Sequence, residues 1–300
     1  MGTDMTAQTL RERREALLGL GLAIVPEMVA GSIELTAPFV DASLGEGVEV
    51  AADLAYGSHE RHVLDVYSAA GEPGTDRPVL VYVHGGGFTM GAKSNPDTPF
   101  FRNLGTWAVQ QGWVAVAMNY RLAPAHSYPS GAEDIAAAIE WIVEHIAEYG
   151  GDPSRIFLSG QSAGAMHVAD YVVGRGGFGA HGRALRGAVL VSGLYDTSAA
   201  AAKGLYRVYW GEDEAGWAGL STLDELVELD LPLLVTVSEF DEPEFQAQAA
   251  QLVSAWQARR GEFPPLHRLY GQNHLTSVYT VGTEWDELGP LLRRFIQANA

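Results

Sequence analysis

The 300-residue sequence contains no cysteine. This absence excludes disulfide bonds, thiolate metal sites and cysteine nucleophiles. It is consistent with a reducing cytoplasm, where we expect the protein to reside. Positive charge is also scarce, with 19 Lys and Arg against 37 Asp and Glu and a formal net charge of −18. This charge repels phosphate backbones and anionic lipids, so we expect no binding to nucleic acid or to a membrane surface.

The sequence also lacks an apolar run of the roughly 20 residues that span a bilayer. The nearest candidate is residues 16–25, which follow Arg11, Arg13 and Arg14 and imitate a secretory signal. Acidic residues lie among these arginines, and Pro26 ends the run before a convincing cleavage site. The pattern favours an amphipathic helix that caps a domain, with secretion as the alternative.

From residue 48 onward, apolar runs alternate with segments of helical periodicity. Continuous apolar runs are typical of strands covered on both faces of a parallel sheet. Strands are predicted at residues 48–54, 62–67, 79–83, 113–118, 155–159, 188–192, 233–238 and 266–270. The alternation predicts one α/β sheet with helices on both faces. No linker or repeat interrupts it, so we predict a single domain over residues 1–300, with residues 1–45 as a small N-terminal helical cap.

Helix signals fall between the predicted strands. Ser130 and Glu133 have the spacing of a capping box, and a helical apolar face follows them until Gly150. A second helix is predicted from the periodicity of residues 245–256, with Gly261 at its end. The last helix is expected at residues 286–298.

Ser162 lies in the pentapeptide Gly160-Gln161-Ser162-Ala163-Gly164, directly after a predicted strand. A serine hydroxyl attacks well when it projects from a tight turn toward a base and a substrate carbonyl. Such a turn brings its neighbours close to other backbone, where a Cβ would clash, and glycine therefore flanks the serine. A small-residue turn that only packs a helix onto a sheet is the alternative for the pentapeptide alone. We predict that Ser162 is a nucleophile.

A second motif, His84-Gly85-Gly86-Gly87-Phe88, ends an earlier apolar run. Rigid backbone N–H groups stabilise a developing oxyanion without reorganisation. We therefore predict an oxyanion hole formed by the N–H groups of Gly86, Gly87 and Ala163. His84 is expected to fix this loop by hydrogen bonding rather than to act as a second base. The two motifs, each after a predicted strand, together indicate acyl transfer.

The general base is expected to be a histidine near the C-terminus. In this kind of α/β architecture the chain order is serine, acid, histidine. Of the nine histidines, His267 and His274 lie beyond a credible acid-bearing strand end. His267 falls inside a predicted strand, whereas His274 lies on the loop after that strand. We predict His274 as the base.

The acid that orients this base is expected just past the strand at residues 233–238. Glu239, Asp241, Glu242 and Glu244 all qualify by position. A short side chain on a tight loop orients an imidazole most rigidly, and Glu239 is still close to the strand. Asp241 is therefore favoured, with Glu239 or Glu242 as alternatives, and the remaining carboxylates of this cluster are expected to be solvated.

These motifs resemble the hormone-sensitive-lipase-like branch of α/β-hydrolase esterases, near the acetyl esterase and arylformamidase group. The resemblance runs from about Leu64 to Phe295, and its landmarks include residues 84–88, 119–124, 160–164, 238–241 and 273–274. It implies an α/β-hydrolase fold with a mostly parallel eight-stranded sheet. It also implies a Ser-Asp-His mechanism without metal or cofactor, acting on esters with small to medium acyl groups. Asp241 and His274 match the acid and base of the family.

Three residues depart from the lipase-like pattern: Gln161 replaces an aspartate, Ala165 a glycine, and Leu275 the first residue of a glycine-phenylalanine pair. They favour the acetyl esterase and arylformamidase group. The expected function is a serine carboxylesterase that works through an acyl-enzyme. The alternatives are an arylformamidase-type amide hydrolase and a non-catalytic binding module on a hydrolase fold.

The partner we expect is a small-molecule ester, and a homodimer is left open. Four aromatic residues in the segment 196–222 hint at an aromatic pocket wall, with core or lid packing as the more common alternative. These residues are Tyr206, Tyr209, Trp210 and Trp217.

Overall fold

The structure is a computed structural model that describes residues 10–40, 45–71, 74, 76–95, 97–175, 184–200 and 204–300. Its centre is an eight-stranded sheet in the order β1-β2-β4-β3-β5-β6-β7-β8. The strands are β1 (Val48–Ala55), β2 (Val63–Ala69), β3 (Arg77–Val83), β4 (Val114–Met118), β5 (Gly151–Gln161), β6 (Leu185–Val191), β7 (Leu233–Phe240) and β8 (Leu266–Asn273). All eight predicted strands are present. From β4 to β8 in this order, neighbouring strands pair in parallel, whereas β2 is antiparallel to both of its neighbours, β1 and β4. The prediction of a mostly parallel sheet is therefore confirmed.

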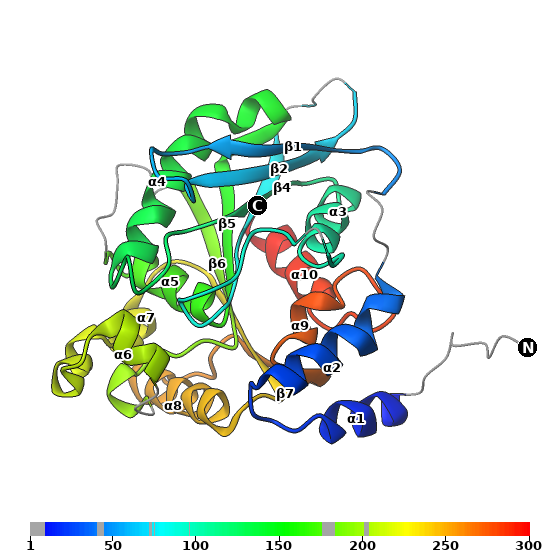
Figure 1. Cartoon of the computed structure of the whole chain (residues 1–300). Helices are drawn as coiled ribbons and strands as arrows, with labels where there is room; N and C mark the ends of the chain where they lie inside the picture. The colour runs from blue at the N-terminus through cyan, green and yellow to red at the C-terminus, as the bar shows by residue number, and fades with distance from the viewer. Residues whose placement is uncertain are drawn as a thin grey trace, which may run out of the picture.

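Helices cover both faces of the sheet (Figure 1). The first face packs against α4 (Ser130–His145), α5 (Ala163–Val172), α7 (Leu223–Glu228) and α8 (Pro243–Arg260) through buried residues such as Ile139, Leu158 and Leu252. The second face packs against α3 (Arg102–Gln110), α9 (Thr276–Tyr279) and α10 (Gly289–Asn299) through Trp107 and Leu292 among others. This cover on both sides explains why the central strands are continuously apolar.

Shorter elements connect these layers. The helix α6 (Gly204–Trp210) lies beside α8 (Figure 1), where the hydroxyl of Tyr206 donates to Glu244 at 3.1 Å. Short 3₁₀ helices are η1 (Ala37–Phe39), η2 (Ile146–Tyr149), η4 (Thr197–Ala199) and η5 (Glu214–Leu220).

The helix ends differ in part from the sequence predictions. The capping box is wrong: Ser130 is the first residue of α4, its hydroxyl donates to the carbonyl of His126 at 3.3 Å, and Glu133 pairs with Arg121 instead. The stop at Gly261 is confirmed, since this residue ends α8 with φ +73. The last helix begins at Gly289, three residues later than predicted.

Two helices, α1 (Leu10–Gly19) and α2 (Pro26–Thr36), form the described N-terminal segment. The single helix expected over residues 16–25 is therefore wrong, because α1 ends at Gly19 and Pro26 opens the next helix. The helix α1 contacts β8, and α2 contacts α9 (Figure 1). Within the described part of the chain, no helix combines the length and apolar character that a bilayer crossing requires.

Candidate active site

Ser162 lies at the sharp junction between β5 and α5. Its backbone has φ +55 and ψ −121, a conformation that non-glycine residues rarely adopt. A Cβ on Gly160 would lie 2.3 Å from the carbonyl oxygen of Gly164, and a Cβ on Gly164 would lie 2.1 Å from that of Val83. No side chain fits at either position. The predicted steric reason for the two flanking glycines is therefore confirmed.

The glycine-rich loop after β3 lies against this junction. A Cβ on Gly85 would come within 2.3 Å of Gln161 Oε1 and 3.2 Å of Ser162 Cβ. Gly86 and Gly87 have φ values of +127 and +57. Within the described residues, neither of their N–H groups donates to another backbone group. The N–H of Ala163, the first residue of α5, has no acceptor inside its helix.

His84 holds this glycine loop in place. Its Nδ1 lies 2.6 Å from the carbonyl oxygen of Gly85, and because a carbonyl only accepts, Nδ1 carries the proton. Burial lowers the pKa of His84 to about 3, so the imidazole is neutral. Its ring stacks on Tyr120 at 4.3 Å, and Arg61 Nη2 bonds the carbonyl of Gly91 at 2.9 Å. The predicted hydrogen bond between His84 and this loop is present.

Asp241 and His274 meet at the ends of β7 and β8. The His274 Nδ1 lies 2.6 Å from Asp241 Oδ1, and the two residues are 2% and 0% exposed respectively. Because a carboxylate accepts, Nδ1 carries the proton and Nε2 is left with a lone pair that can take one. The second oxygen, Asp241 Oδ2, accepts from the backbone N–H of Ser238 at 2.6 Å and from the hydroxyl of Ser192 at 2.7 Å.

The other candidate acids bond elsewhere. Glu239 accepts from Arg14 Nη2 at 2.5 Å and from the N–H of Gly271 at 2.8 Å. Glu242 accepts from the N–H of Ile24 at 3.0 Å. Glu244 accepts from the hydroxyl of Tyr206 at 3.1 Å. Of the four carboxylates considered from the sequence, Asp241 accepts the hydrogen bond from His274. The other candidate base, His267, is exposed on β8.

The structure brings the His274 loop beside Ser162 without a hydrogen bond between the two side chains. Gln161, the residue before the serine, donates from Nε2 to the carbonyl of His274 at 2.8 Å. His274 Nε2 is buried and has no hydrogen-bond partner within the described residues. The ring of Phe245 packs on the imidazole with centroids 4.3 Å apart. Catalytic hydrogen bonds are often longer before substrate binds, so this gap is compatible with a serine-histidine pair.

An aromatic cluster packs beside the nucleophile turn. Phe88, the residue after the glycine triplet, stacks on Tyr209 with centroids 4.4 Å apart. The cluster also contains Ala163. The four aromatic residues singled out from the sequence all belong to this cluster and are at most 9% exposed: Tyr206, Tyr209, Trp210 and Trp217. This burial supports packing rather than an open aromatic pocket wall.

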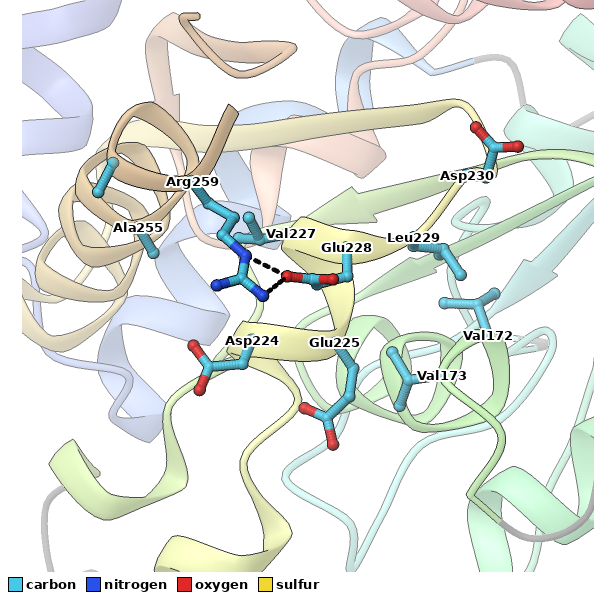
Figure 2. A pocket seen from close by; sticks show the side chains of 11 residues that line it. Val172, Val173, Asp224, Glu225, Val227, Glu228, Leu229, Asp230, Ala255 and Arg259 are labelled. Carbon is cyan, nitrogen blue, oxygen red and sulfur yellow. Dashed lines mark hydrogen bonds and ion pairs between the residues drawn. The ribbon is translucent and has the colours of Figure 1, made fainter. Parts of the chain in front are cut away.

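A cavity of about 980 Å³ lies elsewhere, between the ends of α5, α7 and α8. Figure 2 shows an ion pair between Arg259 and Glu228 at this cavity and the side chains of Val172 and Val173 at its edge. None of the predicted site residues lines it. Among the residues that the structure describes, no group of His, Asp and Glu side chains could hold a metal ion.

Sequence reasoning missed Ser192, which contacts the carboxylate of Asp241. It directly follows β6, at the carboxyl end of a parallel strand. Ligand-binding and reactive groups collect at such strand ends in α/β sheets, and this was the available signal.

Comparisons with known proteins show the family and the fold of this chain. Residues 80–263 match the model of a family described as alpha/beta hydrolase fold. The sequence is 48% identical over 87 residues to carboxylesterase NlhH of Mycobacterium tuberculosis, covering 29% of this chain and 26% of that protein. It is 38% identical over 119 residues to esterase LipQ of the same species, covering 39% of this chain and 27% of that protein. The matched segments thus span about a quarter of these relatives.

Solved structures share the fold over nearly the whole chain. Esterase B from Lactobacillus rhamnosis superimposes with a TM-score of 0.71 at 19% identity, covering 97% of this chain and 96% of that one. A bacterial heroin esterase gives a TM-score of 0.68 at 20% identity, covering 96% and 97%. The family match extends over more than half of the sequence and includes the serine turn, the glycine loop and Asp241. This chain belongs to the alpha/beta hydrolase fold family.

Proposed function

We propose that the protein is a serine carboxylic-ester hydrolase that acts on esters with small to medium acyl groups through an acyl-enzyme. One observation carries this proposal: a buried His274–Asp241 hydrogen bond of 2.6 Å, held beside the Ser162 turn by Gln161. The printed names of the curated relatives, a carboxylesterase and an esterase, support the same reaction.

In the first half-reaction, Ser162 Oγ attacks the carbonyl carbon of the ester. Its proton passes to Nε2 of His274, and the carboxylate of Asp241 stabilises the resulting imidazolium. The carbonyl oxygen becomes an oxyanion that accepts hydrogen bonds from the N–H groups of Gly86, Gly87 and Ala163. When the C–O bond to the alcohol breaks, His274 returns its proton to the departing oxygen.

In the second half-reaction, water attacks the acyl-enzyme at the same carbon. His274 takes a proton from the water, the same N–H groups stabilise the second oxyanion, and Ser162 leaves with the proton that His274 returns. The products are the carboxylic acid and the regenerated serine. All steps use groups of this chain and water.

The test of this proposal is the substitution Ser162→Ala, assayed on short p-nitrophenyl esters. We expect turnover to fall by about 10³-fold or more, because the nucleophile and its proton are both removed. The matched control is Ser198→Ala, which removes an exposed hydroxyl that bonds Asp196 and should leave turnover unchanged. Undiminished turnover by Ser162→Ala would contradict the proposed function.

A second assay separates esters from amides. Phenyl acetate and N-formylkynurenine, offered to the same preparation, distinguish the esterase from the arylformamidase-type alternative. A panel of esters from acetyl to decanoyl then reports the acyl-chain limit. Labelling of Ser162 by a fluorophosphonate probe is expected, and its absence would favour the non-catalytic alternative.

Three further expectations stay predictions: one domain over residues 1–300, a cytoplasmic location and the option of a homodimer. Size measurement in solution tests the last of these.

A further inference from the structure

We infer that Ser192 is a positioning residue of the catalytic machinery, a fourth side chain that locks Asp241 in the orientation that holds His274. This inference rests on the proposed function. It concerns a residue that touches the acid and not the substrate.

The first step is the hydrogen-bond chain that passes through Ser192. Its Oγ lies 2.7 Å from Asp241 Oδ2, while Asp241 Oδ1 accepts a hydrogen bond from His274 Nδ1 at 2.6 Å. A hydroxyl can donate to a carboxylate, which only accepts, so the direction of this bond is fixed. Both oxygens of Asp241 are thus engaged, and rotation about the bond to its carboxyl group would break hydrogen bonds on both sides.

The second step is the position of Ser192 in the sheet. The neighbouring strands β3, β5, β6, β7 and β8 stand in this order. The predicted site groups lie at the ends of four of them: the glycine loop after β3, Ser162 after β5, Asp241 after β7 and His274 after β8. Ser192 directly follows β6, between the nucleophile and the acid. It completes an uninterrupted row of contributions from five adjacent strands.

The third step is the backbone of Ser192. Its φ is +51, in the left-handed region that serine rarely adopts. Strained positions of this kind collect where a side chain must be aimed. The carbonyl of the preceding residue, Val191, accepts from the N–H of Ser162 at 2.9 Å. The N–H of Ser192 itself donates to the backbone carbonyl of Thr236 at 2.9 Å. The end of β6 is therefore tied to the nucleophile turn on one side and to the acid strand on the other.

Ser192 is 2% exposed and Asp241 is 0% exposed, so the hydrogen bond between them is shielded from water. Without this hydroxyl, Asp241 Oδ2 keeps one of its two donors, the backbone N–H of Ser238. Loss of the hydroxyl should therefore loosen the Asp241–His274 bond. The consequence is a less well oriented and less stabilised imidazolium in the transition state.

The experiment compares Ser192→Ala and Ser192→Gly with the wild type. Glycine accepts the positive φ without strain, so it removes the hydroxyl in a backbone that favours the native conformation. The control is Thr236→Val, a substitution of equal size on β7 that removes a buried hydroxyl without a hydrogen-bond partner in the described chain. Active sites are counted by fluorophosphonate titration, and kcat, KM and pH profiles are measured per titrated site.

We expect both Ser192 variants to lose about tenfold in kcat with KM changed less than twofold, because ester binding does not involve this hydroxyl. The acidic limb of the kcat/KM profile, which reports protonation of the free base, should move to lower pH. In proton NMR, the far-downfield signal of the His274 Nδ1 proton, assigned by its loss in Asp241→Asn, should broaden or move upfield. Thr236→Val should match the wild type in all three measurements.

Two results would overturn the inference. One is wild-type kcat and an unchanged downfield signal in both Ser192 variants. The other is a retained signal with an acidic limb that moves to higher pH, which would show that the hydroxyl only reduces the charge on Asp241. These failures are distinguishable from failure of the proposed function, since that function is tested separately by the activity of Ser162→Ala and by fluorophosphonate labelling of Ser162.

Discussion

At the scale of single residues, the two oxygens of Asp241 have separate tasks. Oδ1 accepts from His274, and Oδ2 accepts from Ser192 and Ser238. The neighbouring acid Glu239 is also mostly buried, at 8% exposure, but it bonds Arg14 and the N–H of Gly271. Two carboxylates that are two positions apart in the chain therefore have entirely different partners.

This difference predicts opposite results for two amide substitutions. Asp241→Asn should lower kcat by about 10⁴-fold, because the asparagine amide can donate to Nδ1 and so place the imidazole proton on Nε2, where it blocks the uptake of the serine proton. Glu239→Gln should change kcat less than about threefold. Steady-state kinetics of both purified variants on one short ester provide the measurement. Comparable losses in the two variants would refute the assignment of Asp241.

Single residues also show how much of the site can be predicted from the sequence. The serine, its flanking glycines and the choice of Asp241 followed from local spacing and chain order. The exclusion of Glu239 required a partner that lies 225 positions earlier in the chain, Arg14, which no local pattern reveals. Ser192 was missed for the same reason: a serine after an apolar strand has no motif, and its meaning comes from the strand placed beside it.

At the scale of elements, the junction of β5 and α5 is tightly constrained by backbone contacts. It requires that the first turn of α5 approach the end of β3, where the backbone of Val83 leaves no room for a Cβ on Gly164. Strand and helix are thus in direct backbone contact at this point. The position of Ser162 depends on this contact.

We therefore predict that Gly164→Ala destabilises the protein by about 3 kcal/mol or more, because backbone atoms must move to admit the methyl group. Gly19→Ala is the control, since nothing lies within 4 Å of a Cβ at this position in α1. It should be neutral or add up to about 1 kcal/mol of stability by helix propensity. Urea unfolding followed by circular dichroism measures both, and equal stability of the two variants would contradict the packing argument.

The sequence predicts the strands of this fold better than it predicts the ends of its helices. The strands were all found, because burial on both faces of the sheet makes their apolar runs continuous. Helix starts were less predictable, since the hydroxyl of Ser130 bonds the preceding turn rather than capping α4. The N-terminal apolar run was interpreted as one helix, although Gly21 adopts φ +82 and Pro26 starts a new helix there.

At the scale of the whole molecule, the site is assembled from segments that span residues 84–274 and meet at the carboxyl ends of the parallel strands. Chain order along the sheet, and not sequence proximity, decides which groups are neighbours. The site therefore forms only when the whole molecule is folded. A group inside α5 that titrates near neutral pH changes the free energy of unfolding with pH.

Asp170 on α5 is such a group. It is 4% exposed, and its carboxylate accepts from the hydroxyl of Tyr128 at 3.5 Å. Burial raises the pKa of Asp170 to about 8, although the nearby positive charge of Arg175 and the Tyr128 hydroxyl oppose this rise. In the unfolded chain the pKa of an aspartate is about 3.9, so between these two values the folded state binds more protons than the unfolded state.

The last prediction follows from this imbalance. The contribution of Asp170 is fully present below about pH 4 and is lost as the pH rises through about 8, at up to about 1.4 kcal/mol per pH unit. Asp170→Asn removes this titration, so the difference in unfolding free energy between the variant and the wild type should increase in favour of the variant from pH 5.5 to pH 8. Urea unfolding of both proteins at half-unit pH steps measures this difference, which cancels the titration of all other carboxylates. A difference that stays constant over this range would show that Asp170 is ionised in the folded protein and that its burial is compensated by Arg175.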